Sequence, residues 1–233
     1  MKMMSQIAQS TSIALFTALA ALISLAMLYM LVEPQITHSQ ATETFLIQTN
    51  VTGESSFLVP PTNVTMAGTL NSLTGGQATG TTQFVVQSTS PTGYRVAISF
   101  PTNGTPNAMV SDTSADTSIV DYQGDAAGPE PSAGFTVSGS AQFAYTVVSS
   151  TTADTDDSFF ENAGSCNDGG GSQAVTCWKA PQTAAFDIVT TDSPAPTGAT
   201  SSIIFNVTVP NNPVPVPVAE GYTATATLSL FNI

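Results

Sequence analysis

Apolar and polar residues alternate with a period of two along much of the chain after residue 41. In residues 94–100 every second position is a large apolar residue: Tyr94, Val96, Ile98 and Phe100. This period is the signature of a β-strand with one buried and one solvent-facing side, and the frequent Thr and Val residues suit such a strand. The pattern predicts strands at residues 42–49, 55–59, 80–88, 94–100, 134–138, 141–149, 203–209 and 222–230.

Clusters of Gly, Pro, Asn and Ser separate these predicted strands, for example at residues 90–93 and 210–213. Such residues preset the backbone dihedrals of turns. Many short strands separated in this way favour an all-β fold, namely an antiparallel β-sandwich of the immunoglobulin-like or jelly-roll type. We expect a single domain over residues 42–233, with long surface loops at about 107–131 and 150–182.

Residues 12–32 form an uncharged apolar stretch that predicts an N-terminal hydrophobic helix. Lys2 precedes it and Glu33 follows it, which favours export of the rest of the chain. Small residues at the positions that a signal peptidase recognises favour cleavage after Ala41, so that residues 1–41 would be a signal peptide. A retained membrane anchor and a pilin-type leader are the alternatives. Membrane contact is expected only through residues 12–32, and only if they are not removed.

Charged residues are scarce, at 8% of the chain, whereas a soluble domain has about 25%. Lys and Arg total 3 and Asp and Glu total 16, which gives a formal net charge of −13. After the first residues only Arg95 and Lys179 are basic, so no basic patch is available for nucleic acid. Thr, Ser, Asn and Gln must keep the protein soluble, which is typical of extracellular and cell-surface proteins.

Two cysteines, Cys166 and Cys177, flank a glycine-rich segment. In an exported chain a small even number of cysteines favours a disulfide. The alternative, a pair of metal-ligating thiols, has no nearby His to complete a zinc site. We therefore predict a disulfide that closes a short loop.

Four Asn-x-Thr triplets are candidate glycosylation sites, at Asn50, Asn63, Asn103 and Asn206. Because Asn206 alternates with the apolar residues of 203–209, we expect its side chain to face solvent. Chains rich in Thr and Asn also produce such triplets by chance, so glycosylation stays open.

The sequence contains few residues of the types that commonly act in catalysis. The single histidine, His38, lies in the export segment, so triads and dyads that need a histidine base are not expected. Lys179 is expected to be a surface lysine rather than part of a Ser-Lys dyad, and no phosphate-binding loop is present. We predict that the protein is not an enzyme.

Calcium is the cofactor that the sequence leaves open. Asp154, Asp156, Asp157 and Asp168 gather hard oxygen donors in one irregular region. Their spacing does not match the helix–loop–helix calcium loop, and the alternative is a solvated acidic loop. We otherwise expect no cofactor.

Trp178 follows Cys177 directly, and Phe159-Phe160 lies in the same irregular region. We expect Trp178 to anchor the core or the loop, with a sugar-stacking platform as the alternative. The two phenylalanines are expected to plug the loop rather than to form a contact surface.

Several short segments occur along the chain in a fixed order. The segments are Gly80-Thr-Thr-Gln-Phe-Val-Val, Ser90-Pro-Thr-Gly-Tyr94, Ala133-Gly-Phe-Thr-Val-Ser-Gly139, Gly164-Ser-Cys-Asn167 with Cys177-Trp178, Pro196-Thr-Gly-Ala-Thr200 and Gly221-Tyr-Thr-Ala-Thr-Ala-Thr227. This order resembles that of a group of secreted β-sandwich surface proteins of candidate-phylum and metagenomic bacteria. The resemblance implies a pilin-like or surface-filament subunit, and it carries no catalytic residues.

These features predict an extracellular structural subunit of a cell-surface layer or filament, whose partners are further copies of itself or cell-surface components. Open sandwiches leave edge strands unpaired, and a strand from a neighbour can pair with them. Phe45, Leu46 and Ile47 are the candidate donor strand. The alternative is a monomeric secreted adhesin or glycan-binding module, dependent on calcium, that uses Trp178 and the acidic loops.

Overall fold

The structure is a computed structural model of the 233-residue chain. The residues that it describes are 2–32, 48–49, 51–101, 106–114, 116–124, 132–133, 135, 137, 139–151, 154–162, 165–166 and 177–233. The chain divides into two units, Met1–Thr49 and Asn50–Ile233, which are described separately. The donor candidates Phe45, Leu46 and Ile47 lie outside the described residues.

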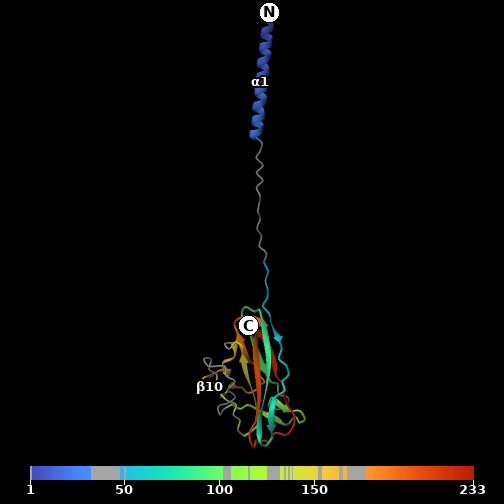
Figure 1. The fold of residues 1–233 in the computed structure, drawn as a ribbon, viewed down its shortest axis with the longest axis vertical. Coiled ribbons are helices and arrows are strands. Elements are labelled where there is room, and N and C mark those ends of the chain that lie inside the picture. The colour runs from blue at the N-terminus through green and yellow to red at the C-terminus, as the bar shows by residue number, and fades with distance from the viewer. Residues whose placement is uncertain are drawn as a thin grey trace. The chain divides into compact units, whose positions relative to one another are not determined.

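The first unit contains one helix, α1 (Lys2–Val32), drawn in blue in Figure 1. Its Ala, Leu and Met residues are strong helix formers, and no proline interrupts them. The expected N-terminal hydrophobic helix is therefore present, with large apolar side chains such as Leu15 and Met30 exposed. Over the part of the chain that the structure describes, no helix is long and apolar enough to cross a membrane.

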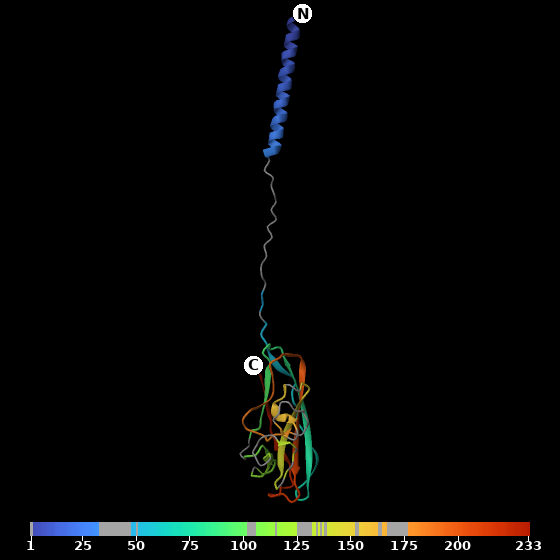
Figure 2. The same ribbon diagram turned by 90° about the vertical axis from the view of Figure 1, so that its left-hand side faces the viewer.

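The second unit is built around an eight-stranded sheet that curls into a half-barrel. Along the sheet the strand order is β1-β3-β13-β8-β6-β5-β14, and β2 pairs with β3 next to β1. The strands are β1 (Ser55–Val59), β2 (Ala67–Asn71), β3 (Gly75–Ser88), β5 (Met109–Ser111), β6 (Ser118–Asp121), β8 (Gln142–Ser149), β13 (Ala195–Val209) and β14 (Tyr222–Ala224). The two longest, β3 and β13, run side by side along the length of the domain (Figures 1 and 2).

A three-stranded sheet of order β12-β4-β15 packs against the inner face of the half-barrel, with the main hydrophobic core between them. Its strands are β12 (Phe186–Thr191), β4 (Tyr94–Ser99) and β15 (Thr227–Asn232). Two short pairs complete the strands of the described residues: β9 (Glu161–Asn162) with β10 (Ser165–Cys166), and β7 (Ser132–Ala133) with β11 (Cys177–Trp178). The prediction of an all-β domain after the N-terminal helix is confirmed.

The alternating pattern of residues 94–100 is confirmed by their burial. Tyr94, Val96, Ile98 and Phe100 are each at most 1% exposed, and they pack with residues of β8 and β13 in the main core. The apolar half of the alternation therefore supplies the face of β4 that packs against the half-barrel.

The expectation of purely antiparallel pairing is wrong at one place, since β6 and β8 run parallel. The reason is the long connection, residues 122–141, that separates them. Parallel neighbours need a crossover of about a dozen residues or more, which this segment supplies.

The interval 107–131, expected to be a loop, contains strands β5 and β6. Met109 and Ile119 face each other in their register, and both are buried in the main core. The strands are only three and four residues long, too short to show a clear period in the sequence. In the interval 150–182 the structure likewise places β9, β10, β11 and η2 (Asp157–Phe159), a single turn of 3-10 helix.

The expectation that Asn206 faces solvent is also wrong, because its side chain is 2% exposed. Asn206 does lie on the outer face of β13, opposite the core. That face is covered at this point by a second apolar cluster that includes Trp178 and Ala144, the cross-strand partner of Asn206. At Asn206, therefore, both faces of β13 are covered.

Candidate functional site

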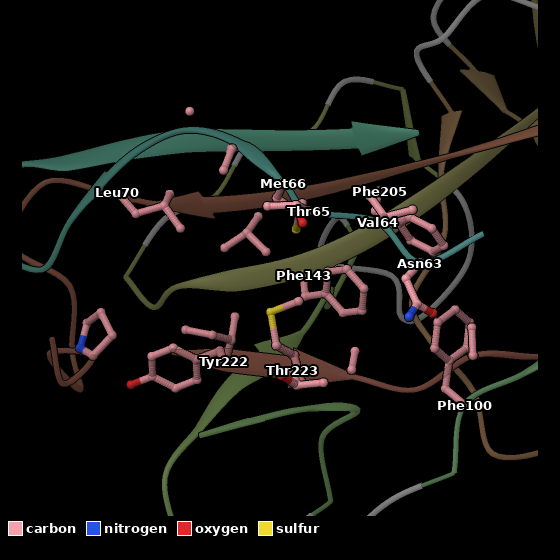
Figure 3. A pocket seen from close by; sticks show the side chains of 18 of the residues that line it. Asn63, Val64, Thr65, Met66, Leu70, Phe100, Phe143, Phe205, Tyr222 and Thr223 are labelled. Atoms are coloured by element: carbon pink, nitrogen blue, oxygen red, sulfur yellow. The ribbon is translucent and has the colours of Figure 1, made fainter. Parts of the chain in front are cut away.

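The half-barrel does not close, and the opening between β2 and β14 is an apolar groove of about 810 Å3. One wall is the segment 61–72, which includes β2, and the other is the segment 217–228, which includes β14. Figure 3 shows side chains from both walls pointing toward each other across the gap. We call this cavity the apolar groove; characteristic residues are Val64, Met66, Leu70, Phe143, Phe205 and Leu228.

The floor of the groove comes from the inner face of the sheet. Phe143 of β8 and Phe205 of β13 lie with stacked rings, their centroids 6.1 Å apart, and both line the groove. Phe205 is only partly buried, and so is Met66 in the facing wall. The main hydrophobic core therefore extends to the groove, where the described residues leave apolar side chains partly exposed.

The walls of the groove are strands with one paired side each. Ala67 to Asn71 of β2 pair with β3, and Tyr222 to Ala224 of β14 pair with β5. Among the described strands none pairs with the other side of β2 or of β14. Every residue of β2 is exposed, including Leu70 at 43%.

Polar chemistry in the groove is limited. Glu220 is the one carboxylate among the lining residues, and its Oε2 accepts a hydrogen bond from the Thr113 hydroxyl. The Tyr222 hydroxyl donates to the Val218 carbonyl oxygen, while burial and the nearby Glu220 charge raise the pKa of Tyr222. Most of the other residues that line the groove are apolar.

The calcium candidates have local structural roles. Asp156 caps the 3-10 turn η2, where its Oδ1 accepts a hydrogen bond from the Ser158 N–H at 3.0 Å. Burial, reinforced by the charge of Asp192, raises the pKa of Asp154, although a hydrogen bond from Thr191 opposes the shift. Asp157 begins the turn.

Asp168 lies outside the described residues. Within those residues no group of three or more His, Cys, Asp or Glu side chains is placed to hold a metal ion. Calcium binding therefore stays a prediction.

The predicted disulfide is present. Cys166 of β10 and Cys177 of β11 are bonded, with Cα atoms 5.8 Å apart. The bond ties the pair β9–β10 to the pair β7–β11 on the outer side of the half-barrel, where β11 contacts β8. It holds Trp178 against the second apolar cluster.

Trp178 is 6% exposed, and its ring lies 5.6 Å from that of Phe135. The prediction that it anchors the core is confirmed, and a buried indole offers no face to a sugar. Phe159 and Phe160 are also buried, at 0% and 6% exposed, as expected for a plug.

The expectation that Lys179 lies on the surface is wrong, because the residue is 5% exposed. Its ammonium nitrogen lies 4.1 Å from the centre of the Phe186 ring. This cation–π contact offsets part of the cost of removing the charge from water. The Lys179 backbone also exchanges hydrogen bonds with that of Tyr145. The residue is thus part of the packing that holds β11 against the sheet.

The candidate glycosylation sites fall into three groups. Asn63 is exposed and lies beside the apolar groove (Figure 3). Asn206 is buried under the second cluster and is inaccessible to modification in the folded domain. Asn50 and Asn103 lie outside the described residues.

Sequence patterns did not reveal the apolar groove. The wall residues Val64, Met66 and Leu70 do follow a period of two, which is a strand signal. Gly68 interrupts the series, and neighbouring prolines and threonines lower its apolar content, so residues 61–71 did not stand out as a strand. The opposite wall was predicted as a strand, but nothing local indicated which strand it would face.

Comparisons with protein-family models, curated proteins and solved structures find no match for this chain.

Proposed function

We propose that this protein is an extracellular structural subunit of a cell-surface layer or filament, and that its two main sheets form a β-sandwich that a strand from a neighbour completes. The observation that carries the proposal is the apolar groove. It lies where the half-barrel fails to close and has an apolar floor and a strand on each side. Such a groove fits a partner that supplies an apolar strand.

The extracellular location is supported by the disulfide and by the composition. A disulfide in a small domain is typical of an oxidising compartment. The surface carries few charges for its size, and the apolar segment 12–32 supports export. The resemblance to secreted β-sandwich surface proteins supports the same location.

Residues 42–49 are the proposed donor strand. They combine a central apolar triplet, Phe45-Leu46-Ile47, with β-branched Thr at three positions, a composition that suits an inserted strand. They also precede the domain, so a neighbour can receive them without any rearrangement of the strands that build the donor's own core. Repeated donation between copies produces an open chain rather than a closed ring when the rotation between copies does not close.

A monomeric adhesin has less support from the described residues. Its proposed platform, Trp178, is buried, and one of its proposed calcium ligands, Asp156, caps the turn η2. The structural-subunit hypothesis assigns the apolar groove to a donor strand, whereas the adhesin hypothesis, which uses Trp178 and the acidic loops, assigns nothing to it.

Replacement of the donor strand tests the proposed function. The full chain and a variant in which residues 42–49 are replaced by eight Gly and Ser residues would be produced with the native N-terminus and imaged by electron microscopy. We expect the full chain to form filaments or sheets and the variant to remain a folded monomer, with an unchanged circular dichroism spectrum. Polymers formed equally by the variant, or a full chain that stays monomeric at all concentrations, would contradict the proposal.

A further inference from the structure

We propose that the apolar groove is the acceptor site for residues 42–49 of a second copy of this chain, inserted between β2 and β14 so that it closes the half-barrel. This inference rests on the proposed function and specifies its contact site.

The mainly apolar lining of the groove favours an apolar occupant. Protein interiors are close-packed, with few voids larger than a water molecule. The groove has a volume of about 810 Å3, and its lining includes the partly buried Met66 and Phe205 and the exposed Leu70, so apolar surface is left in contact with water. Covering such surface is favourable by roughly 25 cal/mol per Å2 of apolar area, so an apolar occupant would be held.

The strand edges show what kind of occupant fits. β2 and β14 each present one backbone edge that pairs with no other described strand. An extended peptide supplies N–H and C=O groups to such edges, whereas an acyl chain or another apolar small molecule fills the space without pairing with them. The groove therefore favours a peptide strand.

The side-chain pattern of residues 42–49 matches the groove. β2 is five residues long, and a five-residue strand spans about 17 Å. With residues 44–48 as the inserted strand, Phe45 and Ile47 share one face and point to the aromatic floor, while Thr44, Leu46 and Gln48 face outward. This register also leaves Glu43 beyond the end of the inserted strand, so that the insertion buries no carboxylate of the donor.

The reach of the chain indicates that the donor is a second copy. Ser55 of β1 pairs with Ser88 of β3, and Ala67 of β2 pairs with Thr79, nine positions further along the same strand. Nine residues of strand span about 30 Å. Gln48 precedes Ser55 by seven residues, which cover at most about 25 Å when fully extended. The chain's own residues 44–48 therefore cannot lie alongside β2, and those of a neighbour can.

A groove-filling substitution tests the site. Ala226 is exposed and lines the groove, whereas its neighbour Thr225 is exposed but does not line it. In the full chain, Ala226→Trp should fill the groove and lower the polymerised fraction at least tenfold in sedimentation assays, while Thr225→Trp should polymerise like the wild type. Wild-type polymerisation by the Ala226→Trp variant would overturn the acceptor site, yet leave the proposed function intact if replacement of residues 42–49 still abolished polymers.

A synthetic peptide of residues 42–49 gives a second measurement that does not depend on a substitution in the domain. Added to the full chain, it should compete with the donor strand and shorten the polymers, whereas the same peptide with Phe45→Ser and Ile47→Ser should have no effect. Equal effects of the two peptides, or shortening by dodecanoate but not by the native peptide, would overturn the inference. The latter outcome would assign the groove to an apolar small molecule.

Discussion

Asp121 shows how a single side chain can couple the stability of this domain to pH. It ends β6, where its Oδ1 accepts a hydrogen bond from the Ala108 N–H at 2.9 Å. Burial raises the pKa of the carboxyl group to about 6, although this hydrogen bond acts in the opposite direction. The folded state therefore holds the proton more tightly than the unfolded chain, whose pKa is near 3.8.

The sign of the pH dependence follows from this shift. Because the folded state binds more protons between pH 3.8 and about 6, stability should fall as the pH rises through this range and then stay constant. Asp121→Asn cannot ionise and can still accept the hydrogen bond. We expect this variant to be more stable than the wild type by about 1–2 kcal/mol at pH 7 and equally stable at pH 3, in urea denaturation. An advantage of the same size at both pH values would show that ionisation is not its cause.

At the scale of elements, the disulfide-linked segments depend on one covalent bond. Strands β10 and β11 are two residues long, too short to be stable through their own pairing. The Cys166–Cys177 bond restricts the unfolded chain over a short loop and links β10 to β11, which contacts β8. The buried Trp178 follows directly and is the only tryptophan of the chain, so its fluorescence reports on this region.

Replacement of both cysteines tests this role. The variant Cys166→Ser/Cys177→Ser should lose about 3 kcal/mol of unfolding free energy, because its unfolded chain is less restricted. The emission of Trp178 should shift to the red as the segment loosens. The exposed neighbour Ser165→Ala serves as the control and should behave like the wild type. Unchanged stability and emission in the double variant would show that packing alone holds the segments.

At the scale of the whole molecule, charge opposes association. Each chain has a formal net charge of −13 at pH 7, with a pI near 4.1, so neighbouring copies repel each other. Ion pairs offset little of this repulsion, since the chain has only three Lys and Arg residues. One of them, Arg95, is already paired with Asp187 of the same domain at 2.9 Å.

Polymerisation should therefore depend on salt. Raising the NaCl concentration from 20 to 500 mM shortens the range of the repulsion to a few ångströms, and it should increase the polymerised fraction at pH 7. Light scattering at fixed protein concentration measures the effect. The variant in which residues 42–49 are replaced by Gly and Ser is the control. Polymers that dissolve at high salt would instead indicate contacts made by attraction between charges.

Local patterns predicted part of this structure because a strand's side-chain alternation is a property of neighbouring residues. The alternation in residues 94–100 identified the buried face of β4, and the two cysteines identified the disulfide. Short or glycine-containing strands such as β2 and β5 were missed, since three to five residues give too few periods to recognise.

Sequence alone determined that this chain carries an apolar N-terminal helix and a β-rich domain, because these follow from composition and local period. Only the tertiary structure decided that Asn206 is buried and that an apolar groove exists. Both depend on how far the large sheet curls and on what covers its outer face. The groove, for example, lies between β2 and β14, which are more than a hundred residues apart in the sequence. No local pattern encodes such an arrangement.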